Sequence, residues 1–139
     1  MKEPDNLARL KNWIEEDVST VRVTGLSGSA QSYYFAQFLA DVKMPSLIIL
    51  SDRKEAERLN KELQFFMSPP DKEEPTVNVR LLDFPPYDVT PLTGLSPHRE
   101  VSTRRLQALY ALMSDGNPVV ATSLDAIFFK ILPKEAFVK

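Results

Sequence analysis

The stretch Val21-Arg-Val-Thr-Gly-Leu-Ser-Gly-Ser-Ala-Gln-Ser-Tyr-Tyr-Phe35 decides the fold that we predict for this chain of 139 residues. A short β-branched run leads into a turn rich in glycine and serine, and an apolar segment of helical character follows. This strand–loop–helix order is the context in which a phosphate-binding P-loop, G-x-x-x-x-G-K-[ST], is found. It predicts the architecture of a nucleotide site at the carboxyl edge of a parallel sheet, where ligands of such folds bind.

The sequence matches the P-loop pattern at its first glycine and its final hydroxyl, but it differs at the two positions on which phosphate binding depends. Gly25 fits the first glycine and Ser32 fits the final hydroxyl, whereas Ala30 replaces the second glycine and Gln31 replaces the lysine. A charged hydrogen bond is worth roughly 1.5–3 kcal/mol, against about 1 kcal/mol for the neutral contact that a glutamine can make. Ala30 would add strain of about 1–2 kcal/mol if its position required a positive φ.

The residues alone leave three interpretations of this loop open. It is a turn that feeds a helix, a site that still binds ATP, or a site for another anion. We favour the turn, because hydrolysis also needs an acidic residue for Mg²⁺ after an apolar strand, and Asp52 and Asp83 are better explained as cap and turn residues. We therefore expect no catalytic residue, no bound cofactor and no metal site. What is left is a vestigial P-loop, consisting of Gly25, Gly28, Ser29, Ala30, Gln31 and Ser32.

The composition of the chain excludes several kinds of site and classes of protein. The chain has no cysteine, which excludes thiol catalysis, disulfides and thiolate metal sites, and it has a single histidine, His98. A formal net charge of −2 gives no global electrostatic case for binding nucleic acid. There is no apolar run of transmembrane length and no signal-peptide pattern at the amino terminus. We therefore expect a cytoplasmic protein without membrane contact.

Hydrophobic periodicity predicts helices that alternate with strands. Helices are expected at residues 6 to about 17, 29 or 32 to 42, 52–66, 96–114 and 122–131. Strands are expected at residues 18–24, 46–50, 77–82 and 118–122, with a proline-rich loop at 68–75 and an irregular segment at 84–94. This order predicts a single α/β domain over residues 1–139. Its sheet would be mostly parallel, with about four strands flanked by helices.

A basic cluster near the start of the fourth predicted helix is the other candidate site. It consists of His98, Arg99, Arg104 and Arg105. A solvated helix surface is the simpler interpretation, and a contact with a partner or a phosphate is the alternative, including DNA binding that would weaken with salt. Ser96 and Pro97 are expected to begin this helix, as its N-cap and first residue.

Several of these elements together resemble one known family. They are Thr24-Gly-Leu-Ser-Gly-Ser-Ala30, Leu47-Ile-Ile-Leu50, Phe84-Pro-Pro-Tyr-Asp-Val-Thr-Pro-Leu92, Leu95-Ser-Pro-His98 and Val119-Val-Ala-Thr-Ser-Leu-Asp-Ala-Ile127. The pattern, which extends over residues 22–133, resembles the amino-terminal, UvrB-like region of the bacterial transcription-repair coupling factors, the Mfd family. The Ser-Pro-His element is more specific than the glycine loop.

The resemblance implies a P-loop NTPase/helicase-like fold, a UvrB domain 1a-like module with a degenerate P-loop, as a fragment of a much longer protein. That protein would be an ATP-dependent DNA translocase that releases stalled RNA polymerase and recruits UvrA in nucleotide excision repair. ATP, Mg²⁺ and DNA would be bound by a motor elsewhere in the parent protein, and UvrA, RNA polymerase and other domains of the same chain would be its partners. The present chain would be a non-catalytic structural and interaction scaffold. A domain that binds nucleotide weakly is the alternative.

Overall fold

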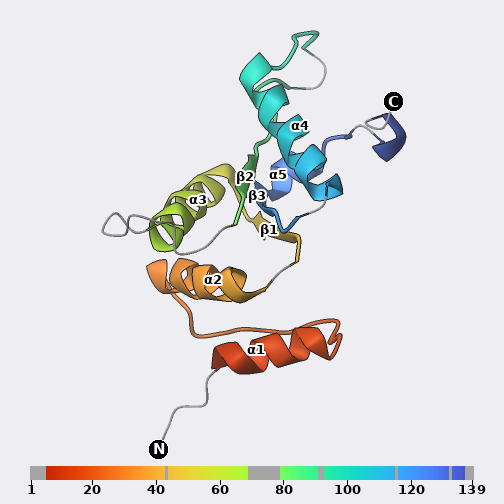
Figure 1. Ribbon diagram of the computed structural model, residues 1–139. Helices are drawn as coiled ribbons and strands as arrows, with labels where there is room; N and C mark the ends of the chain where they lie inside the picture. Colours follow the sequence, from red (N-terminus) through yellow and green to blue (C-terminus); the bar gives the residue numbers. More distant parts are fainter. Residues whose placement is uncertain are drawn as a thin grey trace, which may run out of the picture. The chain divides into compact units, whose positions relative to one another are not determined.

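The computed structural model describes residues 6–42, 44–68, 79–90, 93–114, 116–131 and 133–136 (Figure 1). The chain forms two compact units. The first unit is Met1–Lys43 with Glu62–Asn78, and the second is Met44–Lys61 with Val79–Lys139. One boundary between the units falls within the helix α3 (Arg53–Met67). The expectation that residues 1–139 form one domain stays a prediction.

The second unit is built on a parallel sheet of three strands. These are β1 (Ser46–Leu50), β2 (Leu81–Phe84) and β3 (Val119–Ser123), in the spatial order β1-β3-β2. Both neighbours of β3 pair with it in parallel, so that Val120 lies beside Leu47 on one side and Leu82 on the other. Helices connect the strands and flank the sheet (Figure 1). The predicted α/β fold with a parallel sheet is therefore confirmed, and the described residues form three strands where about four were predicted.

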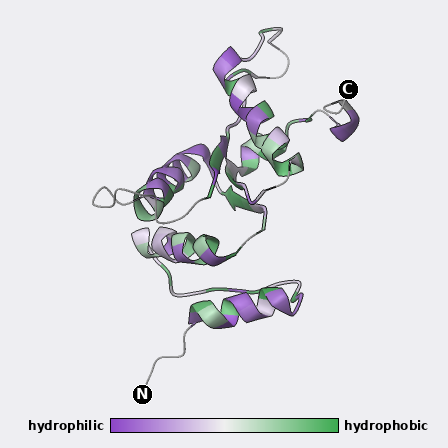
Figure 2. Ribbon diagram, in the orientation of Figure 1, coloured by the Kyte–Doolittle hydropathy of each residue, from purple (hydrophilic) through white to green (hydrophobic). Residues whose placement is uncertain are grey.

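The core of the second unit is built around β3, whose residues are buried on both faces of the strand. All five residues of β3 are buried, as expected of a central strand with an apolar, β-branched run. Helix α4 (Arg99–Met113) and the short helix α5 (Leu124–Ile127) contribute Ala108 and Ala126, which pack with Phe84 and Val120. Edge strand β1 differs, because Leu47 is 52% exposed. Figure 2 shows β1 as hydrophobic and much of α3 as hydrophilic.

The elements that the structure describes in the first unit are helices. Helix α1 (Asn6–Glu15) buries no residue completely, whereas α2 (Ser29–Asp41) buries Ser32, Ala36 and Leu39 along one face. An ion pair joins Lys11 of α1 to Asp41 of α2. The apolar sequence of α2 predicts a helix buried on nearly all sides, and this is wrong, because Tyr33 is 49% exposed. No helix in the described part of the chain is long and apolar enough to span a membrane.

The first predicted strand, residues 18–24, does not form. The segment contains Val18, Val21 and Val23 but is assigned to no strand. The backbone N–H of Val18 donates to the carbonyl of Trp13 at 2.9 Å, which continues the end of α1 rather than beginning a ladder. β-branched residues favour extended backbone, but a strand exists only where a neighbour supplies the ladder hydrogen bonds. The described residues of this unit contain no such neighbour.

The first residues of α3 and α4 are fixed by two different caps. The cap of α3 is confirmed, because the backbone N–H of Glu55 donates to Oδ1 of Asp52 at 3.0 Å. The cap of α4 is wrong: its N-cap is His98 rather than Ser96, and its first residue is Arg99. The backbone N–H of His98 donates to Oδ1 of Asp88 at 3.1 Å, which holds the chain outside the helix up to that residue.

The ends of two other elements differ from prediction. Strand β2 begins later than expected, at Leu81, while the predicted proline-rich loop and the start of the predicted strand fall within residues 69–78, outside the described residues. Thr122 lies in β3, as predicted for the strand 118–122, and its Oγ1 donates to the carbonyl of Phe84 at 2.8 Å. The prediction that the last helix begins at Thr122 is wrong, because its N-cap is Ser123. Helix α5 therefore begins at Leu124, and it ends at Ile127, before the predicted Ile131.

The core assignment predicts unequal effects at two residues that lie side by side. Val120 is 1% exposed and its register partner Leu47 is 52% exposed. Val120→Ala should lower the free energy of unfolding by about 2–3 kcal/mol, because two buried carbon groups are lost and a cavity remains. Leu47→Ala should cost less than about 1 kcal/mol. Urea unfolding measures both, and equal losses would contradict the assignment.

Candidate functional site

The vestigial P-loop keeps the backbone of a tight turn. Gly25 has φ 86° and Gly28 has φ 57° with ψ −141°, conformations that L-residues other than glycine rarely adopt. Gly28 is the N-cap of α2, and its carbonyl accepts the backbone N–H of Gln31 at 3.2 Å. Ala30 lies inside α2 without a positive φ, so the strain considered from the sequence does not arise.

Both helix-start hydroxyls of the vestigial P-loop are engaged by one carboxylate. Ser32 is 2% exposed, and its Oγ donates a hydrogen bond to Oε2 of Glu62 in α3. Oγ of Ser29 lies 3.4 Å from Oε1 of the same carboxylate. All three residues belong to the first unit. The first turn of α2, the positive end of the helix dipole, thus already has an anion beside it.

Gln31, which stands at the lysine position of the P-loop pattern, lies among mainly apolar side chains. It lines a cavity of about 390 Å³ in the first unit. The other lining residues are mainly apolar and aromatic, and they are Leu10, Val21, Val23, Thr24, Leu26, Tyr34, Phe35 and Phe38. Its amide therefore adds no charge to the loop, and its neighbours are hydrocarbon rather than the groups of a phosphate site.

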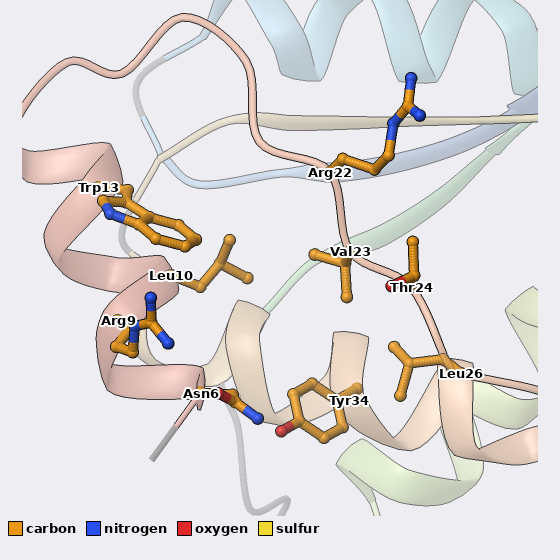
Figure 3. A pocket seen from close by; sticks show the side chains of 9 residues that line it. All are labelled: Asn6, Arg9, Leu10, Trp13, Arg22, Val23, Thr24, Leu26 and Tyr34. Carbon is orange, nitrogen blue, oxygen red and sulfur yellow. The ribbon is translucent and has the colours of Figure 1, made fainter. Parts of the chain in front are cut away.

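A second cavity of about 260 Å³ adjoins this region (Figure 3). Helix α1 contributes Asn6, Arg9, Leu10 and Trp13, and the chain that enters the loop contributes Arg22, Val23, Thr24 and Leu26, with Tyr34 from α2. The guanidinium of Arg9 lies 5.2 Å from the centre of the Trp13 ring, a cation–π contact. Sequence reasoning missed this combination of cations and aromatic rings, because residues 13 and 34 are far apart in the sequence and no motif links them.

Three members of the basic cluster, His98, Arg99 and Arg104, line one open surface cavity of the second unit, which Arg105 does not reach. His98 caps α4, with its Nδ1 accepting the backbone N–H of Glu100 at 3.3 Å. Arg104 forms ion pairs with Glu100 and, at 3.6 Å, with Asp83. Arg99 is exposed. The expectation of a partner or phosphate contact at these residues stays a prediction.

Arg105, the fourth member of the cluster, is 2% exposed and cannot meet a partner at the surface. Its guanidinium lies 3.9 Å from the ring centre of Phe84 and 4.2 Å from that of Tyr87. Nη1 donates to the carbonyl oxygens of Pro85 at 2.6 Å and Ala126 at 3.2 Å. Burial lowers the pKa of Arg105. The side chain therefore fastens the segment after β2 to α5.

Asp83 lies in strand β2, not in the turn predicted for it. Its side chain is half-buried at the carboxyl end of the strand, and it has Arg104 as an ion-pair partner. Burial raises the pKa of Asp83 above its usual value, and the charge of Arg104 offsets part of that rise. In the described structure Asp83 is thus a partly desolvated carboxylate that is paired with Arg104, and the expectation that it is no Mg²⁺ ligand stays a prediction.

The α/β fold with a parallel sheet and a P-loop-like turn defines only a broad class of proteins. Comparison with known proteins shows which of them the sequence resembles. The chain is distantly homologous, over most of its length, to transcription-repair coupling factors and to UvrB. It is 29% identical over 114 residues, 81% of its length, to the transcription-repair-coupling factor of Myxococcus xanthus. It is 24% identical over 135 residues, 91% of its length, to the UvrABC system protein B of Salmonella arizonae.

The chain is short beside both relatives. It spans 9% of the Myxococcus protein and 19% of the Salmonella protein. No family model and no solved structure matches it. The resemblance to the amino-terminal, UvrB-like region of the Mfd family is confirmed at the level of distant homology.

The environment of Arg105 predicts that lysine cannot replace it. Arg105→Lys should lower the free energy of unfolding by about 2–4 kcal/mol, because an ammonium loses the planar contact with two rings and the fork that reaches two carbonyls. The exposed Arg99→Lys is the matched control and should change stability by less than about 0.5 kcal/mol. Guanidinium unfolding compares the two, and a tolerated Arg105→Lys would contradict a structural role.

The raised pKa of Asp83 predicts that the difference in stability between the natural chain and Asp83→Asn depends on pH. Because its pKa is higher in the folded chain than the usual value of about 3.9, the folded state holds this proton more tightly. That stabilisation is present at low pH and is lost as the pH rises from about 4 through the folded-state pKa. Asp83→Asn, neutral throughout, should therefore gain stability relative to the natural chain between pH 3 and pH 7.

Urea unfolding at the two pH values measures this difference. Arg104→Gln in both backgrounds should enlarge it, since Arg104 lowers the pKa of Asp83. A difference that is independent of pH, or that shrinks toward neutral pH, would show that burial does not dominate.

Proposed function

We propose that this chain is a non-catalytic module of a transcription-repair coupling factor, with the UvrB domain 1a-like version of the P-loop helicase fold. The longer protein would be an ATP-dependent DNA translocase that acts in the cytoplasm, releases stalled RNA polymerase and recruits UvrA. Its motor, elsewhere in the sequence, would bind ATP, Mg²⁺ and DNA. The present module would act as a structural and interaction scaffold for the other domains. The distant homology to both repair proteins supports this assignment.

The observation that carries the non-catalytic part of the proposal is the position of Gln31. It occupies the lysine position and lines an apolar cavity with Phe35 and Phe38. A phosphoryl transition state spreads negative charge over its oxygens, and catalysis consists mainly of positioning and charge stabilisation. A loop that brings no cation to the phosphates loses the interaction on which that stabilisation depends.

Titration of the chain with ATP and Mg²⁺ tests this proposal. We expect no heat of binding and no rise in melting temperature at millimolar nucleotide, since a ligand bound a hundredfold above its dissociation constant would stabilise the fold by about 2.7 kcal/mol. Micromolar binding would contradict a vestigial site.

A weak nucleotide-binding domain is the second candidate, and the smaller cavity favours it. Arg9 offers a cation, and Trp13 and Tyr34 offer rings, on the walls of one cavity close to the vestigial P-loop, while the guanidinium of Arg22 points away from these rings (Figure 3). Guanidinium groups suit phosphate, and aromatic rings suit a base. Nucleotide binding through these residues would not require the lysine of an intact P-loop.

Gln31→Lys discriminates between the two candidates. In a weak but authentic nucleotide site, the added charge should raise the affinity for ATP at least tenfold, because a charged hydrogen bond replaces a neutral one. Calorimetry on the natural chain and the variant measures the change, with Gln37→Lys, an exposed position on the same helix, as the control. No gain in affinity would count against the second candidate.

A further inference from the structure

Glu62 is the unassigned residue with the most specific placement in the first unit. It lies in α3, outside the sequence pattern of the P-loop, and its two carboxylate oxygens are directed at different serines of α2. Oε2 accepts the hydroxyl of Ser32, and Oε1 lies 3.4 Å from the hydroxyl of Ser29. Ser32 is almost completely buried, so its hydroxyl is committed to this carboxylate rather than shared with solvent.

The hydroxyl that Glu62 engages is the one with a chemical role in the P-loop pattern. In an intact P-loop, the final Ser or Thr contributes its hydroxyl to the Mg²⁺ that accompanies the phosphates. Ser32 fills that position here. When no Mg²⁺ accompanies the ligand, a carboxylate beside this hydroxyl brings a negative charge to the place where a phosphate, also negative, would have to approach.

We propose that Glu62 acts as a built-in competitor for the vestigial P-loop, with its carboxylate occupying the loop hydroxyls and excluding phosphate-bearing ligands. The inference rests on the proposed loss of nucleotide binding and supplies a second cause for it, independent of Gln31. Without the lysine, the loop lacks a positive charge that attracts phosphate. Glu62 in addition repels phosphate and accepts the hydrogen bond of the Ser32 hydroxyl. The same contact links α2 to the carboxyl-terminal part of α3 within the first unit.

This arrangement has a consequence for engineering the loop. Restoring the cation alone leaves the competitor in place, so Gln31→Lys should gain little affinity for phosphate compounds. Replacing the carboxylate as well should open the hydroxyls to an anion. Glu62→Gln is the suitable change, because its amide oxygen still accepts the hydrogen bond of Ser32 while the charge is removed.

The test compares two double variants with inorganic pyrophosphate as the probe. Gln31→Lys/Glu62→Gln should bind pyrophosphate at least about tenfold more tightly than Gln31→Lys alone, because a unit charge close to the ligand has been removed. Gln31→Lys/Glu57→Gln removes an exposed carboxylate from the same helix, one paired with Arg53, and should behave like Gln31→Lys. Equal affinities for the two double variants would overturn the competitor role of Glu62.

A stability measurement tests the contact without any ligand. The melting temperatures of Ser32→Ala, Glu62→Ala and the combination should be non-additive, with the combination losing no more than the larger single loss. Losses that simply add would show that the two side chains do not interact, and would overturn the inference. ATP binding by the natural chain would contradict the proposed function instead, so the two failures are distinguishable.

Discussion

Parallel pairing is the constraint on which the sheet unit depends. Two parallel neighbours cannot be joined by a tight turn, because the chain must return to the start of the next strand through a crossover. Here β3 pairs in parallel with both β1 and β2, so helical connections have to flank the sheet. The same constraint gathers the carboxyl ends of the strands at one edge. Asp83, Phe84 and Ser123 meet there, and Arg105 secures the chain that leaves β2.

The vestigial P-loop has the backbone conformation of a tight turn but lacks the lysine that binds phosphate in an intact P-loop. Shape depends on the backbone, and two glycines with positive φ suffice to make the turn that begins α2. Chemistry depends on a few side chains, and here an amide stands at the lysine position and a carboxylate beside the final hydroxyl. We propose that the loop serves as a joint between elements, and that phosphate chemistry belongs to another part of a longer repair protein.

Local patterns predicted the elements that find the partners they need. The apolar run 46–50 became β1 with the expected bounds, because β3 supplies its ladder hydrogen bonds. Asp52 caps α3 through a contact three residues away in the sequence. The segment 18–24 failed as a strand because pairing depends on residues elsewhere. Capping of α4 by His98 depends on Asp88, ten positions earlier, and no local rule would find it.

The site was predictable only in part for the same reason. The pattern located the six loop residues and the missing lysine, but nothing in it indicated Glu62, which reaches Ser32 from another helix. Arg105 was grouped with Arg104 because they are adjacent in the sequence, yet successive helical residues face different directions, and one is buried while the other is exposed. Contacts across elements, rather than residue types, decide which of these charges is available.

The central claim is that the vestigial P-loop has no phosphate chemistry of its own. The most direct measurement follows the backbone amide signals of Gly28, Ser29 and Ser32 by NMR while ATP and Mg²⁺ are added to the natural chain. We predict that these signals do not shift as nucleotide rises to millimolar concentration, since Gln31 offers no charge and Glu62 holds the hydroxyl of Ser32. A saturable shift confined to these amides would contradict the claim.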